Sequence, residues 1–282
     1  MVSRYTLILL LVVSCCLSGC VIPTDRQIAA QIADTIRAQI HPQSLKVVVH
    51  RTSSFTSKIR TLDITISGFH VEALPTTLSG ATAKGGVTMV DAPAMARNTA
   101  KSHMIQVENT HVVCENFTVQ QLPVKSIDLK FHNMQVPLEC AQSGQLVIAS
   151  AESALGSAVF DEAGLAAFLQ TRKLPVSHPT IQLTKDGCVV SGRYRAFGNV
   201  PVEVSGNLLA KNKAVLYLEH PKLRVSEVPI PDFVTAQLLK EINPLADLNS
   251  DLKLPAPLTI INVTHGEGTL RVDGQMVFPK PE

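Results

Sequence analysis

The segment Ser126–His132 reads SIDLKFH, so apolar and polar side chains alternate along its whole length. Its apolar positions are Ile127, Leu129 and Phe131. Successive side chains of a β-strand point to opposite faces, so this pattern predicts a strand with one buried face. Arg60–Ser67, RTLDITIS, repeats the pattern with Leu62, Ile64 and Ile66 on the apolar side. Together the two segments predict a sheet with one apolar face.

The C-terminal half extends this pattern as a series of hairpins. Alternating segments there carry apolar residues at Val200, Val202, Val204, Leu270, Val272, Met276 and Phe278. The turn signals between segments are Lys185-Asp186-Gly187, Lys211-Asn212-Lys213 and His265-Gly266-Glu267-Gly268. By contrast, Thr76–His103 is rich in Thr, Ala and Gly, and we interpret it as a long loop or a poorly patterned strand pair.

Three helices are expected. Thr24 and Gln27 form a capping-box pattern ahead of isoleucines at every fourth position, and Pro42 ends this amphipathic segment. Asp161 caps a second helix within Ser157–Arg172, whose apolar residues are Leu165, Phe168 and Leu169. Asp232 caps a third helix that ends at Pro244. With about ten strands and no alternation of strands and helices, these elements predict an α+β fold, mainly antiparallel.

The N-terminal residues have the features of an export signal. Arg4 precedes a short apolar run from Tyr5 to Leu17, and the run ends in Leu17-Ser18-Gly19-Cys20. This tetrapeptide resembles the lipobox of bacterial lipoproteins, which implies cleavage before Cys20 and acylation of its thiol. We therefore expect a signal peptide over residues 1–19 and one elongated domain over residues 20–282, lipid-anchored to a membrane of the bacterial cell envelope.

Charged residues are scarce. Asp, Glu, Lys and Arg make up 17% of the 282 residues, and the formal net charge is +2. Typical domains contain roughly 25% charged residues. A chain with 45% apolar residues and so little net charge is not intrinsically disordered, and it lacks the basic surface that nucleic-acid binding requires. The deficit favours a weakly charged surface or an additional apolar face.

The remaining cysteines leave two alternatives open. Cys114 and Cys140 would close a loop that contributes roughly 3.5 kcal/mol as a disulfide. The other interpretation is that these two and Cys188 are buried thiols. No Cys/His spacing typical of a metal site occurs, and the pairs His70/Glu72 and His265/Glu267 are interpreted as polar residues at strand ends.

Short motifs in the C-terminal half carry a family resemblance. They include Val190-Ser191-Gly192, Asn243-Pro244-Leu245, Leu254-Pro255-Ala256-Pro257-Leu258 and Gly268-Thr269-Leu270-Arg271-Val272-Asp273-Gly274. Over about residues 175–278 the chain resembles the LmeA-like phospholipid-binding family of bacterial envelope proteins, which is itself similar to the tubular lipid-binding (TULIP) superfamily. This resemblance implies a curved antiparallel sheet that wraps an amphipathic helix around an apolar groove, and it carries over no catalytic residue.

These observations predict a lipoprotein that binds or transfers a phospholipid or another acyl lipid without covalent chemistry. Strand parity names the candidate lipid-binding residues Ile64, Ile66, Leu129, Phe131, Val202, Val204, Leu216, Leu270 and Val272. No nucleophile elbow, HExxH, P-loop or GxGxxG occurs, so neither an enzyme nor a cofactor or metal is expected. The alternative is a structural lipoprotein whose self-packed sheet is a scaffold for a protein partner.

Overall fold

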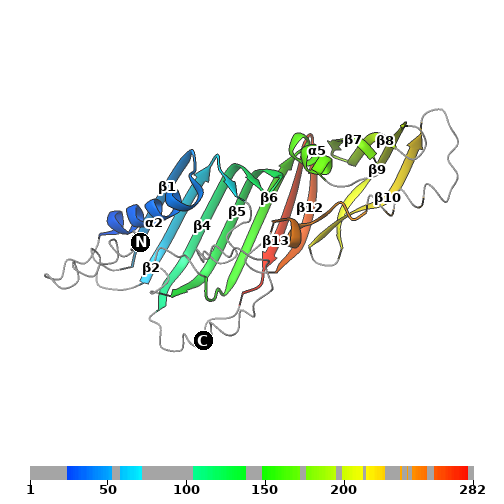
Figure 1. The fold of residues 1–282 in the computed structure, drawn as a ribbon. Coiled ribbons are helices and arrows are strands. Elements are labelled where there is room, and N and C mark those ends of the chain that lie inside the picture. The colour runs from blue at the N-terminus through cyan, green and yellow to red at the C-terminus, as the bar shows by residue number, and fades with distance from the viewer. Residues whose placement is uncertain are drawn as a thin grey trace, which may run out of the picture.

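The computed structural model describes residues 24–52, 58–71, 104–137, 148–171, 176–194, 199–211, 214–225, 236, 240, 243–252 and 257–278. Cys20, Cys140 and the Thr76–His103 segment therefore lie outside the described residues. Figure 1 shows the strands arranged one after another along a long molecule, from β1 near the N-terminal helix to β10 at the far end.

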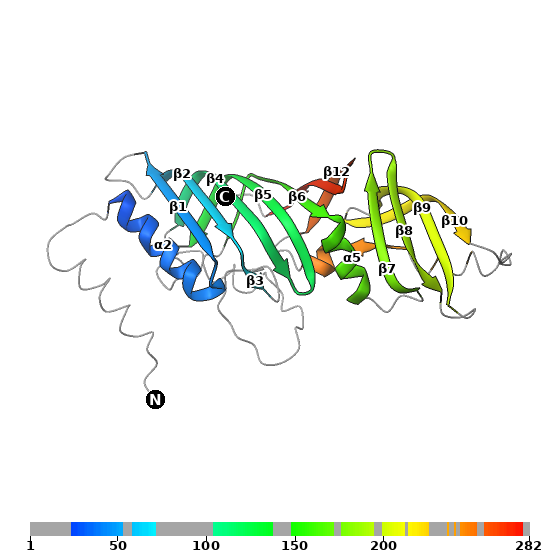
Figure 2. The same ribbon diagram turned by 90° about the horizontal axis from the view of Figure 1, so that it is seen from above.

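The larger sheet has eight strands, in the order β1-β2-β4-β5-β6-β13-β12 with β3 beside β4. Their bounds are Ser44–Arg51 for β1, Lys58–Ser67 for β2, His70–Val71 for β3, Met104–Val119 for β4, Leu122–Pro137 for β5, Ser153–Asp161 for β6, Leu258–Gly266 for β12 and Thr269–Met276 for β13. All pairs are antiparallel except β2 and β3 with β4, which run parallel. The sheet is curved, as expected (Figure 2).

A second sheet of five strands follows the order β11-β10-β9-β8-β7. The bounds are Val176–Thr184 for β7, Gly187–Tyr194 for β8, Val200–Lys211 for β9, Val215–Val225 for β10 and Ala246–Asp247 for β11. The described strands number thirteen, against about ten expected. They form two sheets because the C-terminal hairpin β12–β13 pairs with β6, so the strands between β6 and β12 form a sheet of their own.

Helix α2, Asp25–Ile40, begins as its sequence predicts. Thr24 is the N-cap, and both hydrogen bonds of the capping box with Gln27 are present. The helix ends at His41, whose backbone is left-handed, just before Pro42. Arg51 of β1 donates hydrogen bonds to the Asp25 carboxylate, from its Nε at 2.5 Å and its backbone N–H at 3.2 Å. These contacts place α2 beside β1 at the sheet edge (Figure 2), so the expected wrapping of the sheet around it is not confirmed.

Helix α5, Glu162–Thr171, is capped by Asp161 as predicted, because the Asp161 carboxylate accepts a hydrogen bond from the backbone N–H of Gly164 at 2.7 Å. The helix packs between the two sheets, against β5 and β7. Most of the predicted third helix lies outside the described residues, but Ala236 and Lys240 are helical and exposed. A short helix α7, Leu248–Leu252, was not expected. No helix of the described residues has the length and apolarity of a membrane span.

At the junction of the two sheets, Leu183 of β7 makes hydrogen bonds with the β12–β13 turn and with α5. Gly268 N–H, in the β12–β13 turn, donates to the carbonyl oxygen of Leu183 in β7 at 3.1 Å. Leu183 N–H in turn donates to the Glu162 carboxylate of α5 at 2.6 Å. Buried apolar residues of both sheets belong to one continuous cluster, so the molecule has one apolar interior along its length.

Candidate functional site

The larger sheet has one apolar face because its register aligns the apolar positions of neighbouring strands. Ile64 pairs with Val112 of β4, which pairs with Leu129 of β5, and Leu129 pairs with Gly156 of β6. The next row across the strands is Ile66, Cys114, Ile127, Ala158 and Val272. We call the face that these two rows share the inner face, and the opposite side of the same strands the outer face.

Interruptions of the alternation in β4 and β5 face each other, so the inner face stays apolar along both long strands. In β4 the inner residues are Val107, Thr110, Val112, Cys114, Phe117 and Val119, with steps of three residues at two places. In β5 they are Leu122, Val124, Ile127, Leu129, Phe131, Met134 and Val136, with matching steps. Asn116 and Asn133 have positive φ at these steps, a conformation that asparagine tolerates better than most residues. Each strand has one additional residue at the same place, so the register of the two strands is the same on both sides of the step.

The structure brings six of the nine predicted lipid-binding residues onto the inner face. They are Ile64, Ile66, Leu129, Phe131, Leu270 and Val272. Five of the six are buried, and only Leu129 is half-buried. These five side chains therefore pack against other side chains of the protein.

The other three predicted residues lie in the smaller sheet. Val204 pairs with Val190 of β8 and with Leu223 of β10, and Leu216 pairs with Ala246 of β11. Val202, Val204 and Leu216 are all buried and belong to the same apolar cluster as the inner face. Strand parity therefore identified apolar residues correctly but did not separate the two sheets.

Small residues of β6 and β13 leave room for leucines from neighbouring strands. A Cβ atom at Gly156 would lie 2.6 Å from Leu129 Cδ2, and one at Gly274 would lie 2.6 Å from Leu258 Cδ1. These distances are too short for ordinary contacts, so Leu129 and Leu258 occupy the space above the two glycines. In the middle of the inner face, the leucine side chains of neighbouring strands therefore pack over the glycines.

A threonine interrupts the apolar inner face where β2, β4 and β5 lie side by side. Thr110 lies between Leu62 and Phe131 in the register and is buried. Among the described residues its hydroxyl oxygen has no hydrogen-bond partner. An unsatisfied buried hydroxyl costs about 1–3 kcal/mol. The site thus holds one polar group that the surrounding fold does not satisfy.

The outer face carries polar and charged side chains that contact one another. His111 and Asp128 lie 3.0 Å apart, each with 41% of its side chain exposed. On β13 the Arg271 Nε donates to the Asp273 carboxylate at 2.8 Å. Such exposed pairs contribute little stability. The charged side chains of these strands therefore lie on the outer face, whereas the inner face carries most of the apolar area.

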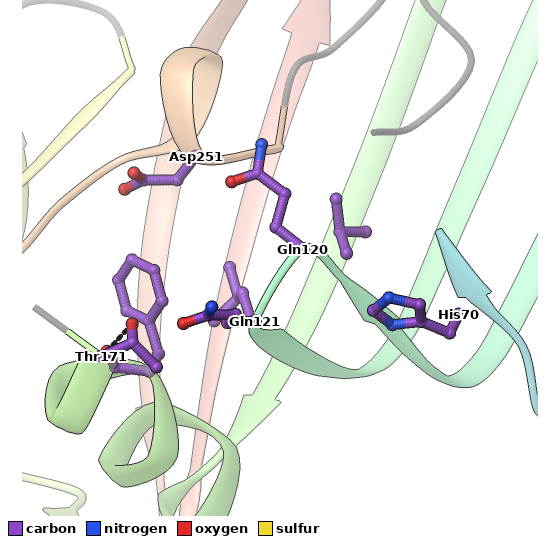
Figure 3. A pocket seen from close by; sticks show the side chains of 8 residues that line it. His70, Gln120, Gln121, Thr171 and Asp251 are labelled. Atoms are coloured by element: carbon purple, nitrogen blue, oxygen red, sulfur yellow. Dashed lines mark hydrogen bonds between the residues drawn. The ribbon is translucent and has the colours of Figure 1, made fainter. Parts of the chain in front are cut away.

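A cavity of about 630 Å³ lies at the β4–β5 hairpin end of the inner face. We call it the hairpin cavity. Its lining residues are His70 of β3, Val119, Gln120, Gln121 and Leu122 of the hairpin, Phe168 and Thr171 of α5, and Asp251 of α7. In Figure 3, Gln120 and Gln121 extend from the hairpin between His70 on one side and Asp251 and Thr171 on the other. Sequence patterns missed this site because its residues come from four separate elements; only the adjacent Gln120 and Gln121 between two strand patterns mark a hairpin end.

His265 was expected to be a polar residue at a strand end, and the structure gives it a packing role. Its Nε2 accepts a hydrogen bond from Leu208 N–H of β9 at 3.1 Å, which links the two sheets. Burial lowers the pKa of His265 below its usual 6.5. His70 lines the hairpin cavity, and Glu72 lies outside the described residues. Across the described part of the chain, no group of three His, Cys, Asp or Glu side chains could hold a metal ion.

Cys114 and Cys188 are buried free thiols in the structure. Burial raises the pKa of each to about 12, so neither forms a reactive thiolate near neutral pH. The pairing of Cys114 with Cys140 stays a prediction because Cys140 is not described. The acylation of Cys20 stays a prediction for the same reason.

Comparison with known proteins identifies the family. No curated protein matches the chain. A family model, that of LmeA-like phospholipid-binding proteins, matches residues 106–275, from β4 to β13 and more than half of the chain. The match includes the smaller sheet, the part of the larger sheet from β4 onward and seven of the eight residues that line the hairpin cavity. The chain belongs to the LmeA-like phospholipid-binding family.

Proposed function

We propose that the chain is an exported lipoprotein of the bacterial envelope that binds a phospholipid, or transfers it between membranes, without covalent chemistry. The acyl chains occupy the inner face, and the acylated Cys20 holds the domain at a membrane. The observation that carries the proposal is the continuous inner face in a member of a phospholipid-binding family. Burial of acyl methylenes against this face contributes about 0.8 kcal/mol each.

The half-buried Leu129 is the point at which a lipid can reach the inner face with the least rearrangement. Its neighbours in the same row, Val112 and Gly156, are also only partly buried. The residues at both ends of β4 and β5, such as Val119 and Met134, are almost fully buried. Lipid entry at the centre of the face therefore displaces the fewest protein contacts.

Lipid extraction tests the proposal. The full chain is purified in detergent and extracted with organic solvent, which removes non-covalent lipid while any acyl chains on Cys20 stay attached. Mass spectrometry should detect phospholipid from the wild type. Leu129→Gln should retain about tenfold less, because an amide on the inner face is poorly solvated by acyl chains.

Leu155→Gln is the matched control for this experiment. Leu155 lies on the outer face of β6, 49% exposed, so the same change there should leave lipid retention unaltered. Absence of phospholipid from the wild type, or an equal loss in both variants, would contradict lipid binding at the inner face.

The membrane anchor is tested separately. Cys20→Ser should move the protein from the membrane to the soluble fraction and remove the mass of the acyl chains from the intact protein. If the variant keeps the wild-type mass shift and stays with the membrane, the anchor assignment is wrong while lipid binding remains open to its own test.

A scaffold for a protein partner is the second candidate, and one observation favours it. Eight of the nine predicted lipid-binding residues are buried, as a self-packed core requires. A scaffold should yield no phospholipid on extraction and should show the same thermal stability with and without added phospholipid vesicles. Stabilisation by vesicles would exclude this alternative, because a ligand stabilises only a fold that binds it.

A further inference from the structure

The hydroxyl of Thr110 is a buried polar group on the inner face. The residue is 4% exposed, and among the described residues its Oγ1 has no hydrogen-bond partner. Folding therefore removes this hydroxyl from water without a replacement for the hydrogen bonds that water provided, which is unfavourable for the protein alone. Such groups are rare in folded proteins, and a ligand that supplies the partner is one physical reason for keeping them.

The neighbours of Thr110 limit the kind of partner that suits it. Leu62 of β2 and Phe131 of β5 lie beside it across the strands, and Val112 is the next inner residue of β4. A charged phosphate or ammonium among these side chains would lose its hydration without compensation. A suitable group is neutral, is attached to apolar chains and accepts a hydrogen bond. The ester carbonyl of an acyl lipid has all three properties.

Thr110 also lies next to the least buried row of the inner face. Val112 is two residues further along β4, about 7 Å away at the usual rise of a strand. Val112 pairs with Leu129, and both are only partly buried, as are Gly156 and Ala158 of β6. A lipid whose first acyl methylenes lie over Val112 and Leu129 therefore has its ester group beside Thr110. The almost fully buried ends of β4 and β5 are not part of this arrangement.

We propose that the Thr110 hydroxyl donates a hydrogen bond to an ester carbonyl of the bound phospholipid and thereby fixes the position of the ester group on the inner face. The inference rests on the proposed function, since the acyl chains of the same molecule occupy this face. Without lipid, the inner face is closed over the hydroxyl. A lipid that opens the central row supplies the acceptor that the lipid-free state lacks, so the new hydrogen bond favours the open, lipid-bound state.

This hydrogen bond gives the site a preference for ester-linked lipids. A dialkyl phospholipid has ether linkages in place of the esters and therefore has no carbonyl at this position. Thr110 would then stay unsatisfied in the complex. A site built to form a hydrogen bond with one group of its ligand disfavours the analogue that lacks this group. Headgroup and chain length can be kept the same in both lipids, so a comparison of the two isolates the ester.

Competition between diacyl and dialkyl phospholipids tests the inference. The full chain in detergent is incubated with vesicles of phosphatidylethanolamine and phosphatidylglycerol, each present in equal amounts of its diacyl and dialkyl forms, and the retained lipids are identified by mass spectrometry. The wild type should retain the diacyl forms about tenfold over the dialkyl forms, which corresponds to about 1.4 kcal/mol. Thr110→Val should abolish this preference and leave the retention of dialkyl lipid undiminished, because valine keeps the side-chain shape without the hydroxyl.

Two further variants serve as controls. Thr110→Ser keeps the hydroxyl and should keep the preference. Thr65→Val makes the same change at an exposed position on the outer face of β2 and should also keep it. A thermal melt checks that each variant folds, and Thr110→Ala removes the same hydroxyl should Thr110→Val fail to fold.

Infrared spectroscopy of the bound diacyl lipid provides a second measurement. The ester carbonyl band should lie at a higher frequency in Thr110→Val than in the wild type, because the carbonyl loses its hydrogen-bond donor. A change that affected only the packing of the inner face would not remove this donor, so the band reports on the hydrogen bond itself.

The outcomes separate the two proposals. If the wild type retains neither form of phospholipid, the proposed function fails and this inference fails with it. If the wild type retains both forms equally, if the preference survives the loss of the Thr110 hydroxyl, if a control variant loses it, or if the ester band is unchanged, only the assignment of Thr110 is wrong. A preference that is lost with the hydroxyl alone, together with a shifted ester band, supports it.

Discussion

The two faces of β5 differ sharply in burial and in charge, although they share one backbone. On the inner face Ile127 and Phe131 are buried, with 5% and 6% of their surfaces exposed. On the outer face the Asp128 carboxylate lies within hydrogen-bond distance of His111 Nε2, at 3.0 Å. The charged residues of β5 are therefore unevenly distributed. The inner positions of β5 carry none, and all charged residues of this strand lie on its outer face. In this strand the apolar surface is therefore concentrated on the inner face.

The largest expected effect comes from β6, where the two faces provide a matched pair. Phe160→Ala removes an inner residue that is 1% exposed and should lower the free energy of unfolding by about 3–5 kcal/mol. Leu155→Ala on the outer face should change it by less than about 0.5 kcal/mol. Denaturant titration measures both. Similar losses for the two variants would remove the distinction between the faces.

Thr110→Val, on the inner face, should raise the stability and not lower it. The change removes the Thr110 hydroxyl, which has no hydrogen-bond partner among the described residues, and keeps the side-chain shape. We expect the free energy of unfolding to rise by about 1.5 kcal/mol. A drop in stability in the same titration would show that the hydroxyl has a partner, and a loss of retained lipid would identify that partner as the ligand.

The capping box at Thr24 stabilises the start of α2, which lies beside β1 at the sheet edge. Thr24→Ala removes the side chain that accepts from Gln27 N–H and should cost about 1 kcal/mol. Thermal melts measure the effect. Thr35→Ala in the same helix is the control, since its hydroxyl donates only to the Gln31 carbonyl. Equal effects of the two changes would mean that the cap has no specific role.

The smallest expected effect on stability comes from protonation of His265. This residue lies in register with Leu270 of the inner face. Burial depresses its pKa in the folded state, so the unfolded chain binds a proton more readily as the pH falls below about 6.5. Its contribution to stability is thus present at neutral pH and is lost on acidification. Protonation also removes the acceptor for Leu208 N–H.

Thermal melts at neutral pH and at about pH 5 check this direction. His265→Gln should lose less stability on acidification than the wild type does. His132→Gln, on the outer face, should behave like the wild type. If the His265 variant keeps the full wild-type pH dependence, this histidine does not couple protonation to the junction between the sheets.

Helix starts and strand faces could be predicted from local sequence. The capping box at Thr24 and the cap at Asp161 are confirmed because a cap depends only on residues within one helical turn. Strand β5 and the turn at His265–Gly268 are confirmed because alternation and turn chemistry are equally local. The nine candidate residues lie at buried or half-buried strand positions for the same reason, and their contact with lipid stays a prediction.

Strand β4 is the main element that the periodic pattern missed. Its inner residues are separated by steps of three at Glu108–Asn109 and at Glu115–Asn116, so no single alternation spans its sixteen residues. The steps are recognisable only beside the matching steps of β5. The hairpin cavity was missed because His70, Gln120, Thr171 and Asp251 are distant in sequence and carry no shared motif.

By itself, the sequence determined which side chains are apolar, which face of each strand they share, where two helices begin and that charge is scarce. The tertiary structure decided that β13 pairs with β6, that β2 runs parallel to β4, that the strands divide into two sheets and that four elements meet around one cavity. The physical reason is that strands pair through backbone hydrogen bonds, which are the same for every residue but proline. Side-chain alternation therefore specifies a face, whereas the choice of partner depends on the packing of the whole chain.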